Sequence, residues 1–227
     1  MTSRNQSISF ADLEWNLPLF DDLYLSMQGQ NVMLVDFYMR DLERELLREY
    51  VDLERTPLQS TMMVSALSQM WVFAAYELLR TWRQRVRQLK KDVQKPAVPE
   101  KKGQKQLAGL YLQGQLEQLR KDKAFGAELD RAYARVEPMF RRIEALRMNL
   151  AKHEVAKTDG VPAIAPGYGR IHILTGSIQW QVDLGGNAVE LVTRQDLGDY
   201  LRSIVIGGPT ARERKQAKAK RPGEKKK

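Results

Sequence analysis

The residues of this chain whose types and spacing best suit chemistry are an arginine and a histidine near the end of one predicted helix. The segment RRIEALRMNLAKHEV, residues 141–155, carries Arg147 and, six positions later, His153. On an ideal helix the two residues flank opposite edges of an apolar stripe formed by Met139, Ile143, Leu146 and Leu150. An imidazole can transfer protons near neutral pH, and a guanidinium can stabilise developing negative charge. We therefore expect a cleft where this helix meets another helix, including the same helix of a second subunit.

Other chemical signatures are missing from the sequence. It contains no phosphate-binding glycine loop, no dinucleotide fingerprint, no nucleophile elbow and no histidine-rich metal motif. Two histidines disfavour a histidine-based metal centre, and the lack of cysteine excludes disulfides and thiolate zinc sites. Carboxylate metal sites stay open, because sequence alone cannot locate them. No metal site or cofactor is predicted, and chemistry without a cofactor has few candidate residues.

The spacing of Arg147 and His153, with five residues between them, resembles the arginine-to-histidine motif of the HEPN superfamily. The resemblance covers roughly residues 58–155, in which a long apolar helix precedes the motif. It implies a helical protein that often dimerises and is often a metal-independent RNase. Arg147 would match the motif arginine and His153 the motif histidine, with Asn149 as a supporting polar residue, four positions before His153 on the same face.

The resemblance further implies an endoribonuclease, with toxin–antitoxin or antiviral defence systems as its setting. Its implied partners are RNA, a second copy of the chain, and a regulator such as an antitoxin. Two further functions remain open from the sequence. One is a non-catalytic helical module that dimerises or docks a partner protein, and the other is a structural protein associated with nucleic acid.

Structural interpretations compete with the catalytic ones at each of these residues. Arg147 can pair with Glu144 in a surface interaction worth about 0.2–0.5 kcal/mol, and His153 can favour the helix dipole. Glu77 is a supporting candidate that could orient Arg147 as a buried acid, or it could be an exposed carboxylate. The aromatic residues around it are better explained as core than as a stacking platform: Trp71, Phe73, Tyr76 and Trp82. His172 is expected to face solvent from a strand.

Most of the chain before Ile164 shows the periodicity of helices, and these predicted helices must position the candidate residues. Apolar residues at three- and four-residue steps predict a helix over residues 30–54 and a second from Leu58 to about Lys91. Further helices are expected over 107–121 and 127–136, and Pro138 suits the first turn of a helix that runs to about Val155. After Ile164 the period changes to that of strands, which predicts an antiparallel meander over 170–174, 178–182 and 189–192. Thr193 is expected to cap a short final helix.

These elements predict a mainly α protein with a small C-terminal meander. Residues 1–29 are expected to be an irregular segment, residues 30–157 a helical bundle with an exposed linker over 90–106, and residues 158–206 the meander and short helix. The last residues, 207–227, are expected to be a disordered basic tail.

Charge is concentrated in that tail. It carries nine basic and two acidic residues, a net of +7 out of +9 for the chain. The basic residues expected to contact nucleic acid are Arg212, Arg214, Lys215, Lys218, Lys220 and Arg221. No signal peptide is visible, and the apolar window over residues 62–79 contains Ser65, Gln69 and Glu77, which favours a buried core helix over a membrane span. We expect a cytoplasmic protein.

Overall fold

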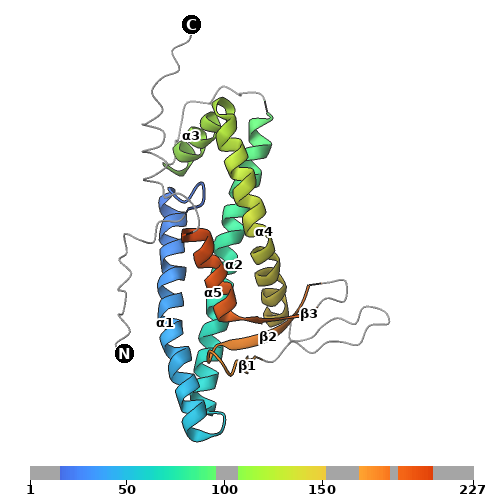
Figure 1. The fold of residues 1–227 in the computed structure, drawn as a ribbon. Helices are drawn as coiled ribbons and strands as arrows, with labels where there is room; N and C mark the ends of the chain where they lie inside the picture. Colours follow the sequence, from blue (N-terminus) through green and yellow to red (C-terminus); the bar gives the residue numbers. More distant parts are fainter. Residues whose placement is uncertain (1–15, 96–106, 152–168, 185–188, 207–227) are drawn as a thin grey trace.

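The computed structural model describes residues 16–95, 107–151, 169–184 and 189–206 (Figure 1). Four helices come first along the chain: α1 (Leu23–Leu53), α2 (Leu58–Val93), α3 (Leu107–Lys121) and α4 (Lys123–Ala151). A three-stranded sheet and a last helix follow: β1 (Arg170–Ile171), β2 (Ile178–Asp183), β3 (Val189–Thr193) and α5 (Arg194–Ile206). The prediction of a mainly helical protein with a small C-terminal antiparallel sheet is confirmed.

Helices α1 and α2 form a long antiparallel hairpin, and α4 runs beside α2 (Figure 1). The sheet packs against α4 and α2, while α5 lies on α1 and α4. Buried side chains of the helices and the sheet belong to one hydrophobic cluster, which includes Trp71, Trp82 and Trp180.

The prediction that residues 1–29 are irregular is wrong for residues 23–29, because α1 begins at Leu23. Asp22 caps this helix by accepting a hydrogen bond of 3.0 Å from the backbone N–H of Leu25. The residues just before it, 16–20, are buried, and the Trp82 indole donates a hydrogen bond of 2.8 Å to the Pro18 carbonyl. Tertiary contacts therefore fix a segment whose local sequence pattern is weak.

The prediction that a new helix starts at Pro138 is also wrong, because α4 is continuous from Lys123 to Ala151 with Pro138 inside it. Asp122 starts the helix by accepting hydrogen bonds from the backbone N–H groups of Ala124 and Phe125. Proline removes one intrahelical hydrogen bond. The buried stripe of α4 holds the helix together across that loss, since Val136, Met139 and Ile143 on either side of the proline are each fully buried.

The prediction that an exposed linker begins at residue 90 is wrong for residues 90–93. Helix α2 continues to Val93, with Leu89 buried, so residues 90–93 are helical. Residues 96–106 lie outside the described part of the chain.

Strand β2 is the centre of the sheet, in the order β1-β2-β3, and both pairs are antiparallel. Strand β1 is shorter than predicted, because the backbone N–H of His172 bonds to the Ser177 carbonyl (2.8 Å) and closes a turn in which Gly176 has φ 71°. The predicted cap of α5 is confirmed. Thr193 accepts from the Asp196 N–H at 2.9 Å, and Asp196 accepts from the Thr193 N–H at 3.0 Å.

Candidate functional site

Arg147 lies near the end of α4, against α2. Its guanidinium carbon is 5.2 Å from the centre of the Tyr76 ring, and the ring of Phe140 stacks on Tyr76 at 5.5 Å. The only hydrogen bond that Arg147 makes within the described residues runs from Nη1 to the Met148 sulfur, 3.2 Å away. Its Nε is buried and has no hydrogen-bond partner there. The competing ion pair with Glu144 is not formed.

This environment leaves Arg147 with donor capacity that the described residues do not use. A guanidinium has five N–H donors, and a buried N–H without a partner costs about 1–3 kcal/mol. The face of an aromatic ring attracts the cation without satisfying those donors. An anion placed beside Tyr76 would satisfy them.

The structure does not place the other half of the predicted pair. Helix α4 is described to Ala151, so His153 lies outside the described residues. Asn149 lies on the last described turn of α4 and is half-buried. The predicted grouping of Arg147 with His153 therefore stays a prediction.

The prediction that Glu77 supports Arg147 is wrong. The Glu77 carboxylate is exposed and accepts hydrogen bonds of 2.8 and 2.6 Å from Arg80, one turn along α2. This hydrogen bond raises the pKa of Arg80 above its usual value. Tyr76, the residue before Glu77, is the one that contacts Arg147. The helical step of 100° per residue separates the two side chains onto different faces.

The core prediction is confirmed for three of the four aromatic residues near Glu77: Trp71, Tyr76 and Trp82 are buried in the hydrophobic cluster. Phe73 is half-buried and is not part of that cluster. His172 does not face solvent from a strand. It is half-buried in the turn after β1, and its Nδ1 lies 2.9 Å from the Thr175 hydroxyl.

A groove of about 720 Å³ runs along α4 beside the end of β2, with Pro138 and Leu184 in its lining. Arg142 forms part of its wall and donates hydrogen bonds of 2.7 and 3.2 Å to the two carboxylate oxygens of Glu190 on β3. These bonds raise the pKa of Arg142. Neither Arg147 nor Asn149 lines the groove, so it is separate from the predicted site.

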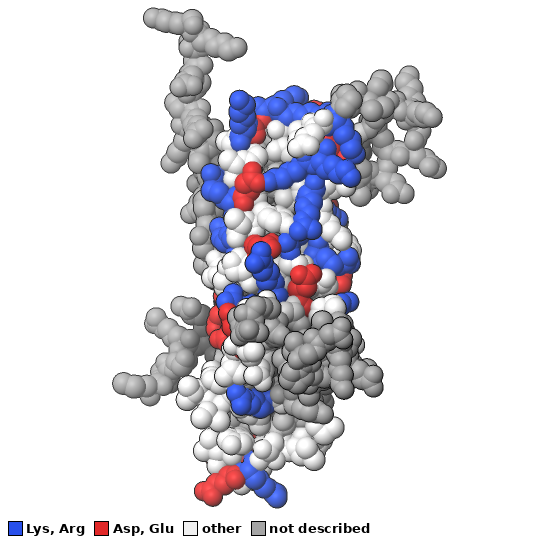
Figure 2. Space-filling model, turned by 90° about the vertical axis from the view of Figure 1, so that its right-hand side faces the viewer, with Lys and Arg blue, Asp and Glu red and all other residues white. Residues whose placement is uncertain are grey.

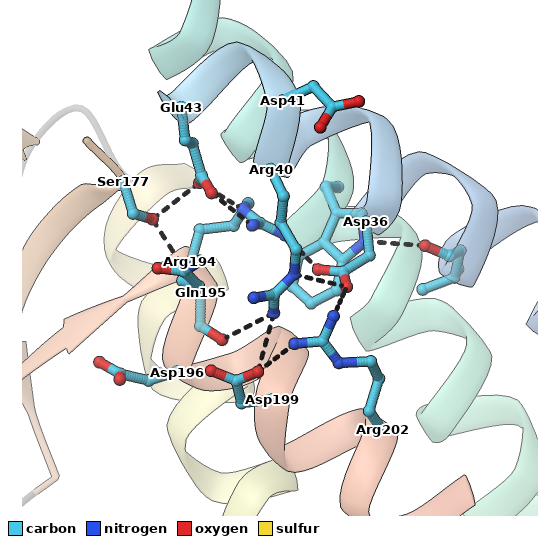
Figure 3. A network of polar contacts seen from close by, with 12 residues as sticks. Asp36, Arg40, Asp41, Glu43, Ser177, Arg194, Gln195, Asp196, Asp199 and Arg202 are labelled. Carbon is cyan, nitrogen blue, oxygen red and sulfur yellow. Dashed lines mark hydrogen bonds and ion pairs between the residues drawn. The ribbon is translucent and has the colours of Figure 1, made fainter. Parts of the chain in front are cut away.

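Sequence reasoning missed a buried network of charges between α1 and α5 (Figure 3). Arg194, Asp36 and Glu43 are all 0% exposed. Arg194 donates hydrogen bonds of 2.6 Å to each Glu43 oxygen and another to Asp36. Ser177 also donates to Glu43 at 2.7 Å, and Arg202 bonds to Asp36 at 3.3 Å.

This network is structural. Burial lowers the pKa of Arg194, but the hydrogen bonds and charges of Glu43 and Asp36 outweigh that effect and raise the pKa overall. With each charge paired and no exposed edge, the three residues have no room for a substrate. The sequence does contain an indication of the buried network. Asp36 and Glu43 are seven positions apart on the apolar face of α1, among Val32, Met39 and Leu46.

The described residues contain no group of three or more His, Asp or Glu that could hold a metal ion. Among them α2 is the one helix long and apolar enough to cross a membrane, and 44% of its apolar window is buried inside the protein, so the prediction of a buried core helix stays a prediction. The tail residues predicted to bind nucleic acid, from Arg212 to Arg221, lie outside the described residues.

No family model matches the chain, and no curated protein or solved structure is significantly similar to it. The HEPN resemblance therefore rests on Arg147, His153 and their helical context.

Proposed function

We propose that this protein is a HEPN-like, metal-independent endoribonuclease in which Arg147 and His153 form the catalytic pair. The observation that carries the proposal is the state of Arg147, whose Nε is buried without a hydrogen-bond partner among the described residues and which has no carboxylate partner there. Charged groups are almost never buried without a partner, and the Nε of Arg147 is buried although the whole residue is half-buried. An unpaired guanidinium on an aromatic ring suits the binding of a phosphate.

In the proposed reaction the ribose 2′-oxygen attacks the adjacent phosphorus and the bond from phosphorus to the 5′-oxygen breaks. His153 takes the proton from the 2′-OH or delivers one to the leaving 5′-oxygen. Arg147 donates hydrogen bonds to the phosphate oxygens as negative charge develops. Asn149 supports this arrangement as a further polar group. The products are a 2′,3′-cyclic phosphate and a 5′-hydroxyl.

The remaining parts of the proposal come from the same resemblance. The protein acts in the cytoplasm as a homodimer, on RNA, within a toxin–antitoxin or phage-defence system, and a partner such as an antitoxin restrains it. A two-fold axis beside α4 would bring two copies of Arg147 and His153 to one cleft. A strictly monomeric mass in light scattering at micromolar concentration would contradict the dimer.

The test compares cleavage of a long RNA in EDTA by the wild type and by Arg147→Ala and His153→Ala. We expect each variant to lose about 10²–10⁴-fold in rate, because each loses a proton-transfer or charge-stabilising group. Arg141→Ala is the matched control. Arg141 is an exposed arginine on the same helix that pairs with Glu137, so its removal should leave the rate unchanged. Equal rates in all four proteins would refute the assignment.

A non-catalytic interaction module is the second candidate, and the first half of α2 favours it. Residues 58–76 carry no charge, and Leu58, Met62, Met63 and Met70 are between 59% and 71% exposed. Adaptable methionines on a surface suit the docking of a partner helix. If the RNA is not cleaved by any of the proteins, this function becomes the better account.

A further inference from the structure

The net charge of the chain hides a strong separation of charge along it. Residues 80–123 contain thirteen basic and four acidic residues, a net of +9, whereas residues 1–79 contain five basic and twelve acidic, a net of −7. Residues 124–206 are neutral overall, and the tail adds +7. Residues 1–206 therefore carry acidic and basic charge in separate segments, although their net charge is only +2.

The fold gathers the basic segment at one end of the bundle. The second half of α2, helix α3 and the start of α4 all lie at the upper end in Figure 1. The backbone carbonyl of Lys95, just after α2, accepts a hydrogen bond of 3.3 Å from Arg120 at the end of α3. Figure 2 shows lysine and arginine, with some acidic residues among them, on the upper half of the face it displays, while the part of the lower half that grey atoms do not cover is mostly uncharged. We call this surface the basic end. Its exposed cations are Arg87, Lys91, Lys95, Arg120, Lys121 and Lys123.

Most of these cations are not neutralised. Lys95 pairs with Asp92 and Lys121 with Glu117. The other four, Arg87, Lys91, Arg120 and Lys123, form no ion pair within the described part of the chain, and Arg87 bonds only to the Tyr133 hydroxyl. Four unpaired, exposed cations at one end of a small domain repel one another and favour a bound anion.

The shape and composition of the basic end select among anionic ligands. Among the described side chains of the second half of α2, of α3 and of the start of α4, Leu112 is the one exposed large hydrophobic residue, at 36%, although the exposed Leu23 and Tyr24 of α1 lie beside this end, where Arg85 contacts the Tyr24 ring. The basic end itself therefore offers little apolar surface to enter a lipid bilayer. The groove along α4 has no residue of the basic end in its lining, which disfavours a small, enclosed anion. Cations spread over three helices suit an extended polyanion.

We infer that the basic end binds the phosphate backbone of nucleic acid. Arg80, Arg87 and Lys91 lie on one face of α2, and Lys91 is eleven positions after Arg80, a rise of about 16 Å. Arg80 itself is paired with Glu77. Arg80 is one turn from Tyr76, on which Arg147 lies. A strand held at the basic end can thus follow α2 towards Arg147. The binding surface goes beyond the proposed cleavage and stands if the cleavage fails.

The experiment measures binding of a fluorescein-labelled, 2′-O-methylated 20-nucleotide RNA by anisotropy over a range of salt concentrations. This strand lacks the 2′-OH needed for the proposed cleavage, so binding is measured apart from activity. The test variant of the full chain is Arg87→Gln/Lys91→Gln/Arg120→Gln/Lys123→Gln. The matched control neutralises four exposed arginines elsewhere: Arg44→Gln/Arg48→Gln/Arg55→Gln/Arg170→Gln. Both have the same net charge and the same tail.

We expect the test variant to bind more weakly than the control. Each lost phosphate contact flattens the slope of log K against log salt by about 0.7. With equal affinities at 1 M salt, the affinity of the test variant at 0.1 M salt is then lower than that of the wild type by about 25-fold for two lost contacts and about 600-fold for four. The control should stay close to the wild type. Equal losses in both variants would overturn the inference by assigning binding to overall charge. Unchanged binding in the test variant, or binding to phosphatidylserine vesicles without binding to the RNA, would also overturn it.

Discussion

Replacement of Arg194 by methionine should destabilise the protein more than any other single loss of charge in the described structure. The guanidinium is 0% exposed and is the group that joins Asp36 to Glu43, both of which are also 0% exposed. Removal of one member of a buried ion pair leaves an uncompensated charge, at a cost of about 3–5 kcal/mol. The free energy of unfolding, measured by urea denaturation, should fall by that amount. Small domains have only about 5–15 kcal/mol in total.

A matched variant separates this effect from the general loss of an arginine. Arg202 also bonds to Asp36, but its side chain is 19% exposed, so Arg202→Met should cost about 1 kcal/mol or less. The triple variant Asp36→Leu/Glu43→Met/Arg194→Met should recover most of the stability, because it leaves no buried charge unpaired. The reasoning is refuted if Arg194→Met costs no more than Arg202→Met.

Two further predictions concern stability. Gly198→Ala should destabilise the protein by about 1–3 kcal/mol, because a Cβ there would lie 2.2 Å from the Asp36 carboxylate. Gly114→Ala should stabilise α3 by about 1 kcal/mol, because a Cβ there would have nothing within 4 Å. A change of melting temperature with the same sign in both variants would contradict this. Burial and a hydrogen bond to Asp21 raise the pKa of Tyr111, so the folded state keeps a proton that the unfolded state releases above pH about 10. Stability should therefore fall more steeply between pH 9 and 11 in the wild type than in Tyr111→Phe, and parallel curves from urea denaturation at each pH would exclude the effect.

The sequence predicted correctly those helices and strands that depend on interactions between residues close together in the chain. Thr193 and Asp196 are three residues apart and cap α5 as expected, and the change of period after Ile164 located the sheet. Pro138 misled the prediction, because the packing that keeps α4 continuous comes from α2 rather than from neighbouring residues.

The network around Arg194 could not be predicted from spacing. Its partners Glu43 and Asp36 are 151 and 158 residues away along the chain. The sequence does show two acidic residues on the apolar face of α1, which indicates that a buried cation pairs with them. It does not indicate which cation does so. Likewise, the sequence predicted Glu77 as a neighbour of Arg147, but in the structure the side chain of α2 that contacts Arg147 is Tyr76.

The most direct measurement of the central claim is the chemistry of the ends left on cleaved RNA. The purified full chain is incubated in EDTA with an RNA and with the same RNA carrying a single 2′-deoxy residue at the main cleavage position. We predict a 2′,3′-cyclic phosphate and a 5′-hydroxyl on the first RNA, and no cut at the deoxy position on the second, because the 2′-oxygen is the nucleophile. Ends with a 3′-hydroxyl and a 5′-phosphate, cleavage that needs added metal, or an unchanged cut at the deoxy position would contradict the proposed function.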